Sequence, residues 1–424
     1  MEGVTLLRVR AAGPLGGNVA ALGAKNAVLK QMAACLLATG SHRLTNVPRT
    51  TDVATMSELL NHLGCRVERS DVHELTITVP PSEQLLPRAP EHLFTAMRAS
   101  LVVLGPLLAR CGEAHMALPG GDDFGGRPIN FHVDGLTSMS AVFDNRHDLI
   151  SGRLPSGRLV GARIVLEYPS HTATDNLLMA AVLATGRTVI DNAAREPEVE
   201  DLGRQLLAMG AQIDGLGTSR LTIEGVDELH AADHCVVPDR VVAATYLATA
   251  LMTGGDVRVS DARSDHMETL LRKFVQMGAE VDLSGEGIRV AGPPKITAVD
   301  VATLPYPGVA TDYKPLITTV LSRAQGVSVV TENLFDGRFR YVDELVKLGA
   351  RITTEGHHAV IQGVDGLRGT SVRATDIRAG AALTLAGLVA SGDTLITGVE
   401  HLDRGYDDFD GNLRALGADV TRQS

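Results

Sequence analysis

A glycine-rich stretch at residues 118–132, LPGGDDFGGRPINFH, combines two adjacent acids with an arginine. Its glycines at 120, 121, 125 and 126 allow backbone conformations that other residues avoid. Such a loop can move, carry Asp122 toward a bound anion and exclude water when it closes. A solvated turn of glycine and aspartate is the alternative interpretation of this stretch taken alone.

Further residues that could do chemistry are spread along the chain as many cations and a few lone acids. This excess of cations suits a small polyanionic substrate together with proton transfer. Asp122 and Asp312 are far apart in sequence, as a separate acid and base would be. A metal site at Asp122-Asp123 is the competing interpretation, but no third acid or histidine follows at ligand spacing, so we expect neither metal nor cofactor. The candidates are Lys25, Asn26, Arg98, Asp122, Asp123, Arg127, Asp312, Arg338, Asp376, Arg378 and Arg404.

Length and charge bound the class of protein. The 424 residues exceed what one hydrophobic core usually supports, which predicts two domains. The formal net charge of -11 argues against a nonspecific nucleic-acid binder, because phosphate binding needs a basic surface. The N-terminus lacks the apolar run of a secretory signal, and no segment is apolar for long enough to cross a bilayer. We therefore expect a cytoplasmic protein that does not bind membranes.

Short motifs and cysteines narrow the class further. The sequence has no P-loop, no GxGxxG after a strand, no GxSxG and no HExxH, which disfavours ordinary kinases, dinucleotide enzymes, α/β-hydrolases and zincins. The four cysteines stand singly among apolar residues, so we expect buried thiols rather than disulfides or zinc ligands.

One signature recurs along the chain and indicates a repeated structural unit. Five copies read Leu or Met, then Gly, then Ala or Cys, followed by the alternation typical of a strand. Their glycines lie at 64, 210, 278, 349 and 417, and a worn sixth copy has Ser140 in place of glycine. Successive copies are about 70 residues apart, which is too regular for chance.

A second signature precedes each copy: an apolar, helix-like run that ends in a glycine and continues as a β-branched strand. Six such units predict a repetitive α/β architecture with three units in each of two domains. The N-terminal strand LLRVRA is expected to pair with the last domain, because the final unit ends without a partner strand. The six glycines, each expected to terminate its helix, are at 40, 112, 186, 254, 326 and 392.

The position fourteen residues before each of these six glycines is polar and marks the predicted start of a buried helix. Helix capping accounts for an asparagine, a threonine or an aspartate there, but an arginine opposes the helix dipole. The three arginines therefore need carboxylate or phosphate partners, from the protein or from a ligand. The six residues are Asn26, Arg98, Thr172, Arg240, Asp312 and Arg378.

Motifs along essentially the whole chain resemble those of the enolpyruvyl transferases, most of all the branch that uses UDP-N-acetylglucosamine in peptidoglycan synthesis. They are GAKNAVL, MRAS, LPGG with GGRP, NAAREPEVEDL, VPDR, DIRAGA and HLDRGY. The resemblance implies an inside-out α/β barrel in each of two domains. The first would comprise residues 1–22 and 238–424, and the second residues 23–237 with a mobile loop at 118–127. We expect a monomer, because no segment suggests a large apolar interface.

The resemblance also implies roles for individual residues. The substrates would be phosphoenolpyruvate and a uridine nucleotide, joined by addition and then elimination of phosphate. Asp312 would take the proton of the acceptor hydroxyl and Asp122 would protonate C3 of phosphoenolpyruvate, while Lys25 and Arg404 complete the catalytic set. The residues implied in substrate binding are Asn26, Arg98, Arg127, Pro128, Asn130, Phe131, Ser170, His171, Thr172, Leu334, Arg338, Asp376 and Arg378.

The chain departs from the family pattern at several positions. Asp122 stands where the family usually has cysteine; an acid can still deliver a proton, but the antibiotic fosfomycin has no thiolate to alkylate. Near the acceptor, Asn130 replaces aspartate, Ser170-His171-Thr172 replaces Ser-Val-Gly, Lys314 replaces glutamine and Gly337 replaces a larger residue.

These departures leave the acceptor open. Transfer to UDP-N-acetylglucosamine is the first hypothesis. The second is the same transfer to the 3′-hydroxyl of UMP or another nucleotide in a nucleoside-antibiotic pathway, where Lys314 would suit a terminal phosphate. The third is a nucleotide-binding regulator that has lost catalysis, although such a protein has no need for two proton-transfer acids.

Overall fold

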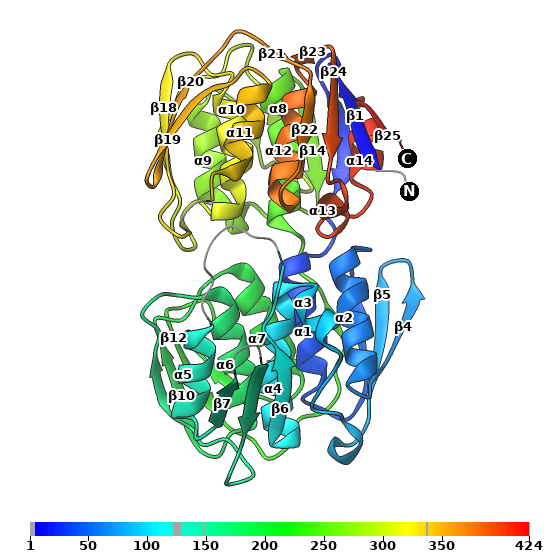
Figure 1. Ribbon diagram of the computed structural model, residues 1–424, viewed down its shortest axis with the longest axis vertical. Helices are drawn as coiled ribbons and strands as arrows, with labels where there is room; N and C mark the ends of the chain where they lie inside the picture. Colours follow the sequence, from blue (N-terminus) through cyan, green and yellow to red (C-terminus); the bar gives the residue numbers. More distant parts are fainter. Residues whose placement is uncertain (1–4, 122–128, 147–148, 336–337, 424) are drawn as a thin grey trace. The chain divides into compact units, whose positions relative to one another are not determined.

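The computed structural model describes residues 5–121, 129–146, 149–335 and 338–423. The chain forms two compact units. Unit 1 contains the described residues up to Leu22 and from Pro238 onward, and unit 2 contains those from Gly23 to Val237 (Figure 1).

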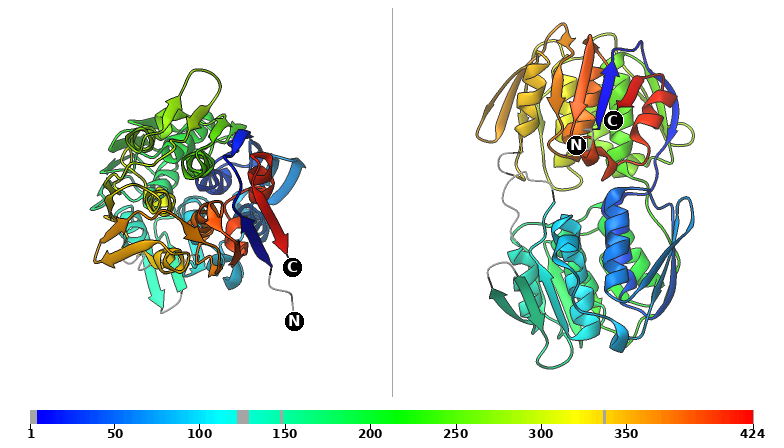
Figure 2. Two further views of the ribbon diagram at one scale, coloured as in Figure 1. Left: turned by 90° about the horizontal axis from the view of Figure 1, so that it is seen from above. Right: turned by 45° about the vertical axis from the view of Figure 1, so that its right-hand side comes forward.

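Three buried helices form the interior of unit 1: α8 (Arg240–Thr253), α10 (Lys314–Leu321) and α12 (Ile377–Gly387), which pack against one another. Every residue of α10 and α12 is buried, so these two helices have no solvent face. Seen end-on, helices of this unit lie inside and strands lie toward the outside (Figure 2). The other helical segments are η3 (Ser264–His266), α9 (Glu268–Gln276), η4 (Thr311–Tyr313), α11 (Arg340–Lys347), α13 (Glu400–Asp403) and α14 (Phe409–Ala415).

The outer helices differ from the inner ones because only one face of each is buried. On α9 the buried residues are Leu270, Leu271 and Phe274, which is the spacing of a single apolar stripe. On α11 they are Tyr341, Val342 and Leu345. The sequence thus separates inner from outer helices by how completely apolar they are.

The strands of unit 1 surround the inner helices. They are β1 (Leu6–Arg10), β2 (Gly16–Ala20), β14 (Asp256–Ser260), β15 (Glu280–Asp282), β16 (Ile288–Ala291), β17 (Val301–Ala302), β18 (Val327–Thr331), β19 (Arg351–Glu355), β20 (His358–Gln362), β21 (Leu367–Arg368), β22 (Ser371–Arg373), β23 (Ala390–Ser391), β24 (Asp393–Thr397) and β25 (Asp419–Gln423). The sheet orders are β22-β24-β1-β25, β15-β16-β14-β2, β17-β18-β20-β19 and β21-β23. Strand β1 pairs with both β24 and β25, with Leu7 opposite Ile396 and Arg422, which confirms the predicted pairing of the N-terminal strand with the last domain.

Unit 2 repeats this plan. Its inner helices are α1 (Lys25–Cys35), η2 (Arg98–Val103) continued by α4 (Leu104–Cys111), and α6 (His171–Ala181). Helices η1 (Ser82–Gln84), α2 (Thr51–His62), α3 (Glu91–Thr95), α5 (Asn130–Ser138) and α7 (Pro197–Ala208) complete the set.

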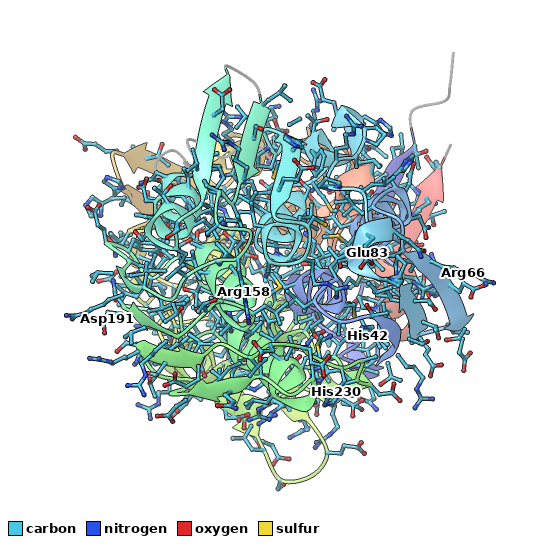
Figure 3. The ribbon with its side chains drawn as sticks, turned by 90° about the horizontal axis from the view of Figure 1, so that it is seen from below. His42, Arg66, Glu83, Arg158, Asp191 and His230 are labelled. Carbon is cyan, nitrogen blue, oxygen red and sulfur yellow. The ribbon has the colours of Figure 1, made fainter. Side chains whose placement is uncertain are left out.

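The sheets of unit 2 lie at its periphery. The strands are β3 (Gly40–Thr45), β4 (Arg66–Asp71), β5 (Glu74–Val79), β6 (Glu113–Ala117), β7 (Val142–Arg146), β8 (Leu149–Arg153), β9 (Arg163–Val165), β10 (Arg187–Asp191), β11 (Gln212–Asp214), β12 (Arg220–Glu224) and β13 (His234–Cys235). Their orders are β13-β3-β5-β4, β11-β12-β10-β9 and β6-β8-β7. In Figure 3, Arg66 on β4 and Asp191 on β10 lie toward the edges of the view.

The repeat glycines serve as conformational markers. The glycines at 64, 210, 278, 349 and 417 have φ between 94° and 102°, a region closed to most side chains, and Ser140 in the worn copy has φ 75°. All six glycines after the inner helices also have positive φ. However, only Gly112 and Gly254 directly end a helix, α4 and α8. The expectation of helix termination is wrong for the other four glycines, which lie beyond the helix end and enter the following strand.

The cysteines and the hydrophobic helices add two findings. Cys35 and Cys65 are buried, but Cys111 is partly exposed and Cys235 is exposed. The expectation of buried thiols is therefore confirmed for Cys35 and Cys65 and wrong for Cys111 and Cys235. Cys235 lies on β13, which is an edge strand of its sheet among the described residues. Within the described ranges, no helix has the length and apolarity needed to span a membrane.

Candidate active site

Each inner helix has one of the six predicted polar positions in its first turn or in the turn that leads into it. Arg98 and Arg240 are the first residues of η2 and α8, and Asn26, Thr172 and Arg378 are the second residues of their helices. Asp312 lies in η4, the turn that leads into α10. The repeat therefore brings polar side chains to equivalent places, at the starts of the buried inner helices.

The helix caps differ from the prediction. Asn26 and Thr172 lie inside the first turns of α1 and α6, whose N-cap residues are Ala24 and Ser170. Asp312 lies inside η4, whose N-cap residue is Ala310. Asp239 and Asp376 cap α8 and α12, and the Asp376 carboxylate accepts from the backbone N–H groups of Arg378 at 2.8 Å and Ala379 at 3.0 Å. Asp239 and Asp376 thus supply a carboxylate at the helix ends where Arg240 and Arg378 lie, which offsets the unfavourable interaction of each arginine with the helix dipole.

Asp312 is the centre of the polar cluster in unit 1. Its carboxylate accepts from Arg338 at 2.8 Å through one oxygen and from Arg378 at 3.2 Å through the other. The Asp312 side chain is 25% exposed, whereas the arginine side chains are only 6% and 4% exposed. A partly accessible carboxylate held between two buried guanidinium groups has a fixed orientation, as a general base requires.

Arg378 is held from several sides. Its guanidinium lies 5.6 Å from the ring centroid of Tyr406, and Tyr406 Oη is within 2.8 Å of the Thr245 hydroxyl. Burial opposes the charge of Arg378, but Tyr406, Asp312 and Asp239 raise its pKa above the ordinary value. The second arginine expected to need a partner, Arg240, packs 5.5 Å from the ring of Tyr306.

Two further predicted residues of unit 1 lie on neighbouring segments. Arg404 directly follows α13, which packs against α12, and it is partly exposed. Leu334 follows β18, and its backbone N–H donates to the Glu332 carboxylate at 2.8 Å. The structure thus places Leu334 beside the Asp312 cluster through Glu332, whose Oε2 accepts from the Thr311 hydroxyl at 2.7 Å.

Lys25 is the charged residue at the start of α1 in unit 2. Its ammonium lies 2.6 Å from the carboxylate of Asp52, in the first turn of α2. The side chains are 12% and 4% exposed, so this ion pair is largely buried. Sequence reasoning missed Asp52, although an acid preceding an apolar stripe in a first helical turn is a usable signal.

A second charged cluster joins α1 to α6. Lys30 Nζ lies 3.5 Å from Asp175 and 3.3 Å from His171, and it donates to the backbone carbonyl of Asn26. His171 Nε2 is 3.4 Å from Asp175. The Asp175 side chain is fully buried, and burial raises its pKa to about 7. The predicted residues Asn26 and His171 are therefore brought together through Lys30.

The raised pKa of Asp175 predicts that the free energy of unfolding depends on pH. Its pKa is raised in the folded protein, so between pH 4 and 7 the folded state binds more protons than the unfolded state, and stability falls as pH rises through this range. The free energy of unfolding of the wild type should drop by about 2 kcal/mol more than that of Asp175→Asn between about pH 5 and pH 8. Urea unfolding at both pH values measures this difference; parallel curves for the two proteins would contradict it.

Thr172 and Arg98 both contact residues of unit 2. The Thr172 hydroxyl lies 3.5 Å from Nε2 of His132, whose Nδ1 accepts from Asn176 at 2.9 Å. Burial lowers the pKa of His132 to about 3, so this imidazole is neutral and serves as a structural partner. Arg98 donates to the carbonyl of Pro119, near the start of the glycine-rich stretch, at 3.5 Å.

The remaining predicted residues divide into two groups. Asn130 is exposed as the first residue of α5, Phe131 packs against the core of unit 2, and Ser170 caps α6 by accepting from Ala173 N–H. Asp122, Asp123, Arg127, Pro128 and Gly337 lie outside the described residues. Among the residues that are described, no group of three or more His, Cys, Asp or Glu side chains could hold a metal ion.

The interpretation of Lys314 as a phosphate ligand is wrong. Its side chain is 0% exposed and forms an ion pair at 2.9 Å with Glu332, which is equally buried. The sequence could not show this, because it places the two residues in different elements. Sequence reasoning also missed Glu332 as part of the cluster.

Comparisons with known proteins agree with this fold. The sequence matches the family described as EPSP synthase (3-phosphoshikimate 1-carboxyvinyltransferase) over residues 9–413. It is 48% identical to UDP-N-acetylglucosamine 1-carboxyvinyltransferase of Nocardia farcinica, covering 96% of each chain, and 47% identical to that of Corynebacterium efficiens, covering 98% of this chain and 97% of the relative.

Solved structures share the fold. The enolpyruvyl transferase NikO from Streptomyces tendae superposes with a TM-score of 0.88 at 24% identity, over 99% of both chains. EPSP synthase from Acinetobacter baumannii superposes with a TM-score of 0.79 at 19% identity, over 99% of this chain and 100% of the other. The predicted two-domain α/β fold class is thereby confirmed, and the chain belongs to the EPSP synthase family of enolpyruvyl transferases.

Proposed function

We propose that this protein transfers the enolpyruvyl group of phosphoenolpyruvate to a hydroxyl of UDP-N-acetylglucosamine and releases phosphate. The observation that carries the proposal is the full-length similarity to relatives of that name, at 48% identity over 96% of the chain. The Arg338–Asp312–Arg378 cluster supports it, because it supplies a base beside cationic groups that suit an anionic substrate.

The reaction assigns one task to each catalytic residue. Asp312 accepts the proton of the acceptor hydroxyl while the oxygen of that hydroxyl bonds to C2 of phosphoenolpyruvate. Asp122 delivers a proton to C3. The C2–C3 double bond becomes a single bond, and the product of this step is a tetrahedral phospho-ketal. Loss of a C3 proton and of phosphate from C2 then restores the double bond as an enol ether. Lys25 and Arg404 hold the phosphate and carboxylate charges of phosphoenolpyruvate.

The binding residues fall to the two substrates. We assign Arg98, Arg127, Arg338 and Arg378 to phosphoenolpyruvate. The nucleotide is assigned to Asn26, Pro128, Asn130, Phe131, Ser170, His171, Thr172, Leu334 and Asp376. The division of the chain at residues 22/23 and 237/238 supports the two proposed domains. Both substrates are phosphorylated and do not cross membranes unaided, so we place the reaction in the cytoplasm.

The test is phosphate release from phosphoenolpyruvate with UDP-N-acetylglucosamine and, in a separate reaction, with UMP. Turnover with the first acceptor alone supports the proposal, and turnover with UMP alone replaces it by the nucleoside-antibiotic alternative. A regulator without catalysis would release phosphate with neither. Asp122→Asn separates these cases further: an enzyme loses turnover, whereas a binding protein keeps its affinity for the nucleotide unchanged.

Fosfomycin sensitivity gives an independent prediction at position 122. The epoxide alkylates a thiolate, and a carboxylate is a much weaker nucleophile. The wild type should therefore keep its activity after incubation with fosfomycin in a phosphate-free buffer. Asp122→Cys should be inactivated with time and should gain the mass of one fosfomycin. Inactivation of the wild type at the same rate would show that the drug acts elsewhere.

A further inference from the structure

A fully buried ion pair lies beside the Asp312 cluster in unit 1. Lys314 Nζ is 2.9 Å from Glu332, and neither side chain has any exposed surface. Lys314 also donates to the backbone carbonyl of Arg338, and its ammonium lies 3.8 Å from the ring centroid of Phe339. A buried charge pair of this kind is costly in solvation, so its retention requires good geometry and further hydrogen bonds.

Glu332 has those further hydrogen bonds. One carboxylate oxygen accepts from the Thr303 hydroxyl and the Leu334 N–H, each at 2.8 Å. The other accepts from the Thr311 hydroxyl at 2.7 Å. The Lys314–Glu332 pair therefore connects the segment after β18 to the turn η4 that carries Asp312.

The connection continues to the Asp312 carboxylate. The Thr311 hydroxyl donates to Glu332 and accepts from one Nη of Arg338 at 2.9 Å. The other Nη of Arg338 donates to Asp312 at 2.8 Å. Arg338 is thus fixed at both ends, its backbone carbonyl by Lys314 and its guanidinium by Thr311 and Asp312.

We propose that Lys314 and Glu332 are positioning residues that hold Arg338 and Thr311, and through them orient the Asp312 carboxylate for proton acceptance. This inference rests on the proposed function of Asp312. When Lys314 loses its proton, Glu332 loses its ionic partner and the Arg338 carbonyl loses a charged donor. Turnover by Asp312 then falls, although neither positioning residue contacts the substrate.

The surroundings of Lys314 set the pH at which this happens. Burial lowers the pKa of Lys314 to about 8, opposed by the charge of Glu332 and of Asp376 and assisted by that of Arg338. Tyr341 also faces the ammonium, 5.9 Å from its ring centroid, and burial raises the pKa of this phenol, so it stays neutral. For Glu332, burial is outweighed by Lys314 and Thr311, which lower its pKa. The pair is therefore intact below about pH 8 and lost above it.

The experiment compares kcat and KM between about pH 6 and pH 10 for the wild type, Lys314→Gln and Lys314→Met. The wild type should lose kcat above about pH 8, and Lys314→Gln, whose amide can still donate to Glu332, should lack this decline. Lys314→Met should lower kcat about ten- to a hundredfold at neutral pH, with KM for phosphoenolpyruvate changed less than about threefold. Lys347→Gln is the control, because it removes an exposed lysine 2.7 Å from Glu344 in the same unit.

The outcomes separate this inference from the proposed function. An alkaline decline that is the same in the wild type and in Lys314→Gln would overturn the positioning role. A Lys314→Met variant with a changed KM or a lower stability but an unchanged kcat would also overturn the positioning role, because this result would mark a purely structural pair. Absence of turnover in the wild type with every acceptor would instead remove the proposed function. Lys314→Gln keeps the polar packing, so the test holds even if Lys314→Met does not fold.

Discussion

Asp312→Asn is expected to lower kcat by about a thousandfold, because the amide cannot accept the proton of the acceptor hydroxyl. The amide has the size of the carboxylate, so the turn should keep its shape, but its single oxygen can accept from only one of Arg338 and Arg378, which lie at 2.8 Å and 3.2 Å. Steady-state phosphate release measures the loss, and KM for both substrates should change much less than kcat.

Asp256→Asn is the matched control for this prediction. Asp256 is also held by an arginine, Arg289, with a 2.8 Å contact from Nε, but its side chain is exposed at the start of β14 in the same unit. This variant should keep wild-type turnover. Equal losses in the two variants, or an Asp312→Asn enzyme with nearly full activity, would remove Asp312 from the mechanism.

Lys25→Met is expected to lower kcat/KM for phosphoenolpyruvate by at least about a hundredfold, since a buried cation that faces an anion contributes strongly to its binding. The free energy of unfolding of this variant should also be lower by about 2 kcal/mol, because Asp52 loses a cation at 2.6 Å in a site where both side chains are largely buried. Phosphate-release kinetics and urea unfolding measure the two effects.

Asp52→Asn separates the two roles of Lys25. It keeps the ammonium and removes the opposing charge, so phosphoenolpyruvate binding should survive while stability falls. Lys273→Met, which removes a partly exposed lysine that contacts the Asp300 carbonyl at 2.8 Å, should change neither. If Lys25→Met lost only stability, Lys25 would be a structural residue and its assignment to phosphoenolpyruvate would be wrong.

The repeat was visible in the sequence because it is tied to backbone conformation. Glycines with φ near 100° are hard to replace, so they mark each unit, and Ser140 kept the conformation after the glycine was lost. Helix starts were visible for a related reason. Polar residues such as Arg240 and Arg378 interrupt otherwise apolar runs, and the first turn is where a polar group can still be satisfied.

Contacts between distant segments were not visible. Asp52 and Glu332 pair with Lys25 and Lys314, which lie in other elements, and only the packing of the helices brings each pair together. The interpretation of Lys314 failed for this reason, since an isolated lysine in a sequence carries no sign of its burial. The capping role of Asp376 was also missed, because capping depends on the dihedral angles of a single residue.

The most direct test of the addition–elimination account is the transfer reaction run in D₂O with phosphoenolpyruvate and UDP-N-acetylglucosamine. Protonation of C3 by Asp122 converts the methylene group to a methyl group, and elimination then removes one of its three hydrogens. The account predicts that the enol ether product carries deuterium in its methylene group, and that Asp122→Asn forms neither this product nor free phosphate. Phosphate release accompanied by a product free of deuterium would contradict the addition step and with it the proposed mechanism.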